Sequence, residues 1–120
     1  MHEVSIMESV LETAAAEAAK AGAKRISRIR LKVGILSGVV PEALEFAFEA
    51  LKDGTAACGA TLEIEPAPAR FLCLECGARP ELCEMAFACP ACGGALIVDS
   101  GGGDLELAQL ELTQPDQDHV

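Results

Sequence analysis

The chain has 120 residues, a net charge of −10 and a pI near 4.5. This length permits one modest core plus a small metal-stabilised module, and the acidic balance argues against nucleic-acid binding, which needs clustered positive charge. No apolar run approaches a membrane span, and the start lacks the features of a signal peptide, so we expect a cytoplasmic protein without membrane association.

The first predicted element is a helix that ends near Gly22. Residues 1–4 are expected to form an extended lead, and Ser5 with Glu8 matches a capping box, in which two side chains satisfy N–H groups of the first turn. One face of this helix is apolar at helical spacing, through Met7, Val10, Leu11, Ala14, Ala18 and Ala21.

A half-buried strand is predicted next, because apolar and basic residues alternate from Ile26 to Val33. After a break at residues 34–38, Pro41 opens a second helix that ends at Gly54. The buried stripe of this second helix is predicted to be Leu44, Ala47, Phe48 and Leu51.

The next strand is predicted over residues 61–65, stopped by Pro66 and Pro68, with Glu63 and Glu65 on its outer face. If it neighbours the first strand, these glutamates pair across the sheet with basic side chains. That explanation is favoured over phosphate binding for six clustered bases: Lys20, Lys24, Arg25, Arg28, Arg30 and Lys32.

Two Cys-x-x-Cys pairs, separated by twelve residues, offer four thiolates from two tight turns. Four thiolates suit tetrahedral Zn²⁺ in a closed, structural site. Gly77 and Gly93 directly follow the two pairs, and we expect them to let backbone N–H groups point at the sulfurs. The predicted zinc ligands are Cys73, Cys76, Cys89 and Cys92.

The alternatives to a zinc site are a redox pair and two disulfides. A redox pair of the thioredoxin type would open a helix, whereas Pro90 and the glycines favour turns, so zinc is preferred. Of the two remaining cysteines, Cys58 is expected to be a half-buried thiol. Cys83 is expected to be a small loop residue, with exchange into the zinc site as the alternative.

Short strands are expected on both sides of the metal, at residues 70–72 and 96–98, followed by a flexible glycine joint at 101–103. The final strand, 104–112, needs a bulge near Ala108 to keep its leucines in phase, and it is expected to return to the main sheet. Residues 114–120 are predicted to be a disordered tail.

The sequence resembles the HypA/HybF family of [NiFe]-hydrogenase maturation factors, which are nickel metallochaperones. The resemblance covers residues 1–112 in order. It rests on Met1-His2-Glu3, on residues 34–44 with 46–49, on residues 59–65 and on the two cysteine pairs.

This resemblance implies an α+β protein with two helices on a small mixed β-sheet and an inserted zinc-ribbon-like module. The nickel-binding domain would span residues 1–69, completed by strand 104–113, and the zinc module residues 70–103. The resemblance assigns nickel binding to His2, with Glu3 beside it, and structural zinc to the four paired cysteines. It also implies that the HypB GTPase and the hydrogenase large-subunit precursor are partners.

The chemistry of the N-terminus supports nickel without the family. The α-amine of Met1, the amide and imidazole of His2 and the Glu3 amide are nitrogen donors for planar Ni²⁺. An enzyme is not expected, because the only other histidine is His119 and the zinc site has no open position. The alternative function is a zinc-stabilised scaffold with no nickel role, and the expected assembly is a monomer or weak homodimer.

Overall fold

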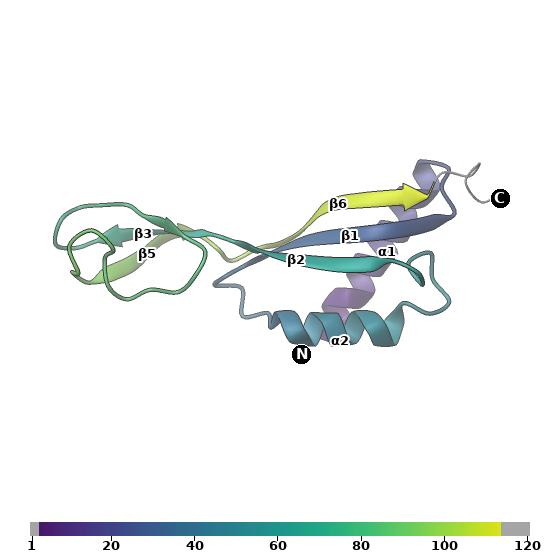
Figure 1. Ribbon diagram of the computed structural model, residues 1–120, viewed down its shortest axis with the longest axis horizontal. Helices are drawn as coiled ribbons and strands as arrows, with labels where there is room; N and C mark the ends of the chain where they lie inside the picture. The colour runs from purple at the N-terminus through teal and green to yellow at the C-terminus, as the bar shows by residue number, and fades with distance from the viewer. Residues whose placement is uncertain (1–2, 114–120) are drawn as a thin grey trace. The chain divides into compact units, whose positions relative to one another are not determined.

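The computed structural model describes residues 3–113 (Figure 1). Its helices are α1 (Glu3–Lys20) and α2 (Pro41–Leu51). Its strands are β1 (Arg25–Gly34), β2 (Thr61–Ala67), β3 (Ala69–Cys73), β4 (Glu81–Leu82), β5 (Leu96–Gly101) and β6 (Leu105–Thr113). Neither described helix has the length and apolar character needed to cross a membrane. The predicted tail, 114–120, lies outside the described residues.

The strands form two three-stranded sheets, one in the order β2-β1-β6 and the other in the order β4-β3-β5. The last strand therefore returns to the side of β1, as predicted. The predicted fold class is confirmed: the protein is α+β, with two helices, small mixed sheets and a four-cysteine module between β2 and β6.

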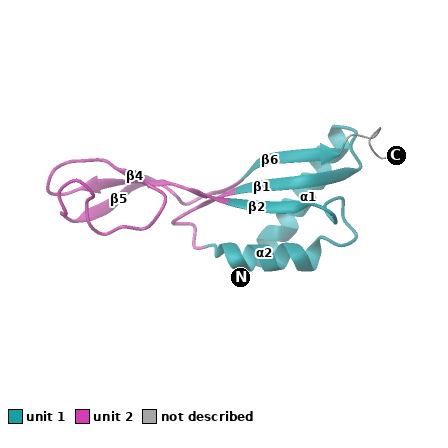
Figure 2. Cartoon of the chain, in the orientation of Figure 1, with its two compact units in different colours: residues 1–31, 39–64, 107–120 teal, residues 32–38, 65–106 magenta. Residues whose placement is uncertain are grey.

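The chain forms two compact units (Figure 2). Unit 1 comprises Met1–Leu31, Val39–Ile64 and Leu107–Val120, and unit 2 comprises Lys32–Gly38 and Glu65–Glu106. Each unit is therefore assembled from separate stretches of the sequence, and β1, β2 and β6 contribute residues to both.

The core of unit 1 contains the predicted apolar faces of both helices and of β1. It includes Met7, Val10, Leu11, Ala14, Ala18, Ile26, Ile29, Leu31, Leu44, Ala47 and Phe48, all buried. Leu51 is only half-buried, and Ala21 is exposed because α1 ends at Lys20. Gly22 adopts a φ of 75° there, and the Ala23 N–H donates to the Ala18 carbonyl at 2.9 Å, which closes the helix.

The predicted start of α1 is wrong. The helix begins at Glu3, so Ser5 and Glu8 lie inside it and form no capping box. Glu3 is helical rather than part of an extended lead. A carboxylate in the first turn interacts favourably with the helix dipole, which supports this earlier start.

The basic face of β1 is paired with glutamates of both neighbouring strands. Arg28 Nη1 lies 3.4 Å from Glu63 Oε2 on β2 and 3.4 Å from Glu111 Oε2 on β6. Arg30 Nη2 lies 3.3 Å from Glu63 Oε1. The predicted cross-strand pairing is confirmed for Glu63 with these two arginines. It is wrong for Glu65, which forms no ion pair within residues 3–113 and whose Oε1 is buried without a hydrogen-bond partner there.

The predicted end of β2 is also wrong, because the strand continues through Pro66 to Ala67. β2 is an edge strand in the order β2-β1-β6, and a proline on an edge can direct its missing N–H away from the ladder. The Ala67 carbonyl still accepts a hydrogen bond from the Ile35 N–H at 3.1 Å.

Unit 2 is organised around β3 and β5, the two strands that were expected on either side of the metal, and the structure pairs them antiparallel. Phe71 is opposite Val98 and Cys73 is opposite Leu96. The two-residue strand β4 adds to the other edge of β3, where Arg70 is opposite Glu81. Strand β4 was not predicted, since two residues show no alternation.

The glycines at 101–103 do not form the predicted flexible joint. Gly101 ends β5, and the Gly102 carbonyl accepts a hydrogen bond from the Leu36 N–H at 2.7 Å. A Cβ on Gly34 would collide with the Gly102 carbonyl. The run is therefore glycine-rich because two backbone segments approach closely.

Candidate functional site

Four cysteine side chains meet in unit 2. Cys73 is the last residue of β3 and Cys76 lies in the turn after it, while Cys89 and Cys92 flank a second turn ahead of β5. Their Sγ atoms all lie within 4.8 Å of one another. The structure thus brings together the four residues that the sequence predicts as zinc ligands.

Backbone N–H groups inside each cysteine pair hold the sulfurs in place. Cys73 Sγ accepts hydrogen bonds from the N–H groups of Glu75 at 3.3 Å and Cys76 at 3.4 Å. Cys89 Sγ accepts one from the Ala91 N–H at 3.4 Å. Such bonds stabilise negative charge on sulfur, which a metal ligand needs.

The two glycines that follow the cysteine pairs shape turns in which other backbone N–H groups point at the sulfurs, as expected. Gly77 and Gly93 have φ values of 77° and 78°, a region that favours glycine. Their N–H groups donate to the carbonyls of Cys73 at 3.1 Å and Cys89 at 2.8 Å, not to sulfur. They therefore close the two turns and leave the sulfurs to other donors.

The sulfur spacing fits a tetrahedral zinc ion. Zn–S bonds of about 2.3 Å place the sulfurs about 3.8 Å apart, whereas a disulfide requires about 2.05 Å. The Sγ atoms of Cys73 and Cys92 are 3.5 Å apart, and those of Cys76 and Cys89 are 3.8 Å apart. All four cysteines are free, which favours metal ligation over two disulfides.

The thiols of this cluster differ in acidity. Hydrogen bonds from the Cys76 and Glu75 N–H groups lower the pKa of Cys73 to about 6, against the effect of burial. At Cys92 the Gly94 N–H lowers the pKa, but the neighbouring cysteine sulfurs outweigh it and raise the pKa to about 12. Four thiolates at this spacing repel one another, and a bound divalent cation would offset that repulsion.

Two of the cysteines also belong to the apolar core of unit 2. That core contains Ala69, Phe71, Cys73, Cys89 and Leu96, all buried, whereas Cys76 and Cys92 are exposed. Because the core of unit 2 is small, ligation at Cys73 and Cys89 would tie its strands and loops together.

Cys58 and Cys83 lie outside the four-cysteine group, and both are exposed. The expectation that Cys58 is half-buried is therefore wrong; it lies in the turns between α2 and β2. Cys83 follows β4 in a loop, as expected.

Of the predicted nickel ligands, Met1 and His2 lie outside the described residues, and Glu3 is the first residue of α1. Glu3 Oε2 accepts a hydrogen bond from the Val40 N–H at 3.2 Å, and this bond is the main reason that the pKa of Glu3 falls below its ordinary value of 4.5. Sequence reasoning missed this contact. The available signal was the lack of a capping side chain before Pro41, which leaves N–H groups of α2 in need of an outside acceptor.

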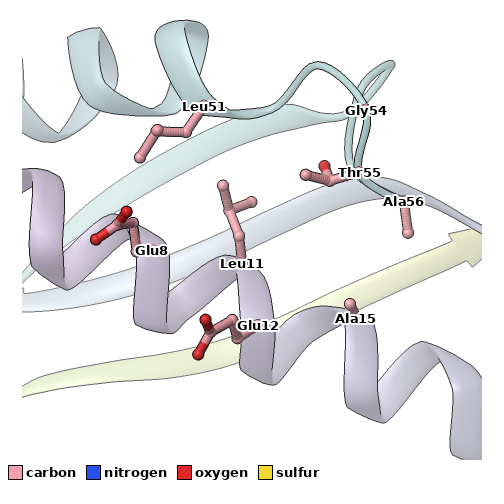
Figure 3. A pocket seen from close by; sticks show the side chains of 8 residues that line it. All are labelled: Glu8, Leu11, Glu12, Ala15, Leu51, Gly54, Thr55 and Ala56. Atoms are coloured by element: carbon pink, nitrogen blue, oxygen red, sulfur yellow. The ribbon is translucent and has the colours of Figure 1, made fainter.

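A separate hollow lies between α1 and the segment that follows α2 (Figure 3). Glu8 and Glu12 stand on one side of it, and Leu11 and Leu51 project into the space between the helices (Figure 3). None of its eight lining residues is a histidine or cysteine, so it offers no soft metal ligand.

Comparison with known proteins gives a consistent set of relatives. Residues 1–112 match the family model described as HypA, "Hydrogenase/urease nickel incorporation, metallochaperone". The hydrogenase maturation factor HypA of Rhizobium leguminosarum bv. viciae is 43% identical over 112 residues, covering 93% of this chain and 99% of that protein. HypA of Roseiflexus sp. (strain RS-1) is 44% identical, covering 92% and 91%.

A solved structure is also similar. The solution structure of the Ni metallochaperone HypA from Helicobacter pylori superposes with a TM-score of 0.64 at 25% identity, covering 93% of this chain and 97% of that one. The likeness therefore extends over both units of the chain.

Proposed function

The chain belongs to the HypA family of nickel-incorporation metallochaperones, and on this basis we propose that it binds Ni²⁺ at its N-terminus and delivers it to the [NiFe]-hydrogenase large-subunit precursor. The observation that carries the proposal is the family match over residues 1–112, which includes the N-terminal tripeptide. The HypB GTPase is the proposed partner in this delivery, in the cytoplasm and without catalysis by the chain itself.

The proposed nickel ligands are His2, Met1 through its α-amine, and Glu3 through its amide nitrogen. Adjacent nitrogen donors form chelate rings in one plane, the geometry that Ni²⁺ accepts. The α-amine and imidazole must lose protons to bind, so nickel binding should weaken as the pH falls from about 8 to 6. An N-terminal site also suits transfer, because a partner can approach it from one side.

The Glu3 side chain supports this arrangement from the described part of the chain. Its hydrogen bond to the Val40 N–H ties the third residue to the start of α2. The other two proposed ligands, Met1 and His2, directly precede this anchored residue in the sequence. Residues 1–69 with 104–113 form the proposed nickel-binding domain.

A structural zinc ion is proposed for the second metal, held by Cys73, Cys76, Cys89 and Cys92 in the module 70–103. The support is the spacing of their sulfurs and their backbone hydrogen bonds. Four protein ligands leave no open position, so zinc would supply stability rather than chemistry.

The deciding experiment is a calorimetric nickel titration of tag-free, zinc-loaded protein, run beside His2→Ala and His119→Ala. The second variant removes the only other histidine and serves as the matched control. We expect about one Ni²⁺ per chain for the native protein and for His119→Ala, and none for His2→Ala at equal zinc content. Equal nickel binding by all three proteins, or by none, would instead favour a zinc-stabilised scaffold.

A further inference from the structure

Most basic side chains of this protein have an acidic partner. Within residues 3–113, ion pairs to carboxylates are formed by Lys20, Arg28, Arg30, Lys52, Arg70 and Arg79. The chain has nine bases and nineteen acids, and the three bases without such a pair in this range are Lys24, Arg25 and Lys32. In so acidic a chain, two adjacent unpaired cations need an explanation.

Lys24 and Arg25 line the same hollow in unit 1, here named the basic hollow. Its walls come from residues 24–27, from the turns at 55–59 and from Thr113 at the end of β6. Its volume is about 480 Å³, which is in the range of small-molecule sites.

The unpaired charges in the hollow beside Glu8 and Glu12 do not indicate a ligand site. Acids outnumber bases by ten in this chain, so many carboxylates must lack a basic partner whether or not a ligand exists. Two exposed glutamates on one helix face are therefore an ordinary solvated surface. The excess of acids does not explain why two cations that line one hollow lack carboxylate partners within residues 3–113.

Two of the three hydroxyl groups that line the basic hollow already donate hydrogen bonds within the protein. Ser27 Oγ donates to the Glu111 carbonyl at 3.1 Å, and Thr55 Oγ1 donates to the Lys52 carbonyl at 2.6 Å. The charged groups that line the hollow are the two cations, which donate hydrogen bonds and have no acceptor capacity. They favour an anionic occupant.

The number of charges selects the class of anion. A phosphate monoester carries nearly two negative charges at pH 7, which match the two cations, whereas one carboxylate would leave a cation uncompensated. A guanidinium also binds phosphoryl oxygens in bidentate fashion. Ala56, a half-buried apolar residue of the same hollow, can contact an organic group.

We propose that the basic hollow binds a phosphate monoester, with Lys24 and Arg25 on the phosphoryl oxygens and the organic group against Ala56. This site is independent of the nickel and zinc sites. Absence of phosphate monoester binding would therefore leave the proposed metallochaperone function unaffected.

The test is an NMR titration of the full-length, zinc-loaded, ¹⁵N-labelled protein with phenyl phosphate, benzoate and phenol at physiological salt. We expect saturable amide shifts at residues 24–27 and 55–59 with phenyl phosphate, and at least tenfold weaker binding of benzoate and phenol. Equal binding of benzoate, or no saturable shift with phenyl phosphate, would overturn the proposal.

Two double variants distinguish binding at this site from a general effect of net charge. Lys24→Gln with Arg25→Gln should weaken phenyl phosphate binding by about tenfold or more for each cation lost. Lys32→Gln with Arg70→Gln removes the same charge within unit 2 and should leave the affinity unchanged. Equal losses in the two double variants would contradict a local site.

The residues after Thr113 offer a competing occupant, because they include Asp116 and Asp118. A chain that ends at Thr113 distinguishes the two cases. Binding of phenyl phosphate by the shortened chain but not by the full chain would assign the hollow to these carboxylates and overturn the proposal. Similar binding by both chains supports it.

Discussion

Glu3 and Val40 join the starts of the two helices. Glu3 Oε2, in the first turn of α1, accepts a hydrogen bond from the N–H of Val40, the N-cap residue of α2, at a distance of 3.2 Å. One carboxylate therefore stabilises two helix N-termini, through the dipole of α1 and through a hydrogen bond at α2. The residue after His2 is thereby anchored to the helix pair of unit 1.

Glu3→Gln should lower the melting temperature at pH 7, because the amide keeps the acceptor oxygen but loses the charge. The pKa of Glu3 is lowered in the folded protein, so its stabilising contribution is present above the ordinary value of 4.5 and is lost as the pH falls through the folded pKa. Thermal unfolding from pH 7 to pH 3 should therefore show the two proteins converging in acid. Glu45→Gln, on the exposed face of α2, should not reproduce this convergence.

Adding Gly-Ser before Met1 should weaken nickel binding strongly, because the α-amine moves away from the imidazole of His2 and a chelate ring is lost. Calorimetry of the extended protein, with the same dipeptide added after Val120 as the control, measures the effect. Unchanged nickel affinity in the N-terminal extension would show that the amine is not a ligand.

Cys92→Ala should release zinc and broaden the amide resonances of unit 2 while those of unit 1 persist, because Cys73 and Cys89 are both proposed ligands and core residues. Zinc content and a two-dimensional NMR spectrum test this together. Cys83→Ala is the matched control, since its side chain lies outside the four-cysteine group. Loss of zinc in that control would show that Cys83 exchanges into the site.

Gly102→Ala should destabilise unit 2 by about 1–3 kcal/mol, because its φ is 79° and a Cβ would lie 2.8 Å from the Ala69 Cβ. Gly103→Ala, where a Cβ meets nothing within 4 Å, should cost much less. Hydrogen exchange at the amides of β3 and β5 compares the two variants. Equal protection in both would contradict the close approach seen here.

Arg28→Gln should destabilise unit 1 by about 0.5–1 kcal/mol, since Arg28 links Glu63 on β2 with Glu111 on β6 and is only partly exposed. Chemical denaturation of Arg28→Gln, Glu63→Gln and the double variant isolates the coupling. The coupling should shrink in 1 M salt. A coupling free energy near zero at low salt would mean that Arg28 and Glu63 lie close together without stabilising the fold.

Sequence patterns predicted well which sides of the individual helices and strands are buried. Alternation identified β1, helical spacing identified the buried sides of α1 and α2, and paired cysteines located the group that the structure brings together. Each of these features depends on residues a few positions apart. Local spacing is enough to define them.

The features that the sequence did not predict depend on distant partners. The start of α1 involves Glu3 and Val40, which are far apart in the sequence. The passage of β2 through Pro66 depends on its edge position in the sheet. The glycine run around Gly102 depends on Gly34 and Leu36, which approach it from a different part of the chain.

The sequence by itself thus determined the α+β class, the order of the elements other than β4, the family and the four-cysteine motif. Periodicity and ligand spacing are local properties that can be recognised in the amino-acid sequence alone. Only the tertiary structure decided that Lys24 and Arg25 lack carboxylate partners within residues 3–113 and share a hollow with the turns before β2. Pairing and concavity arise when segments distant in sequence pack together, and no local pattern contains that information.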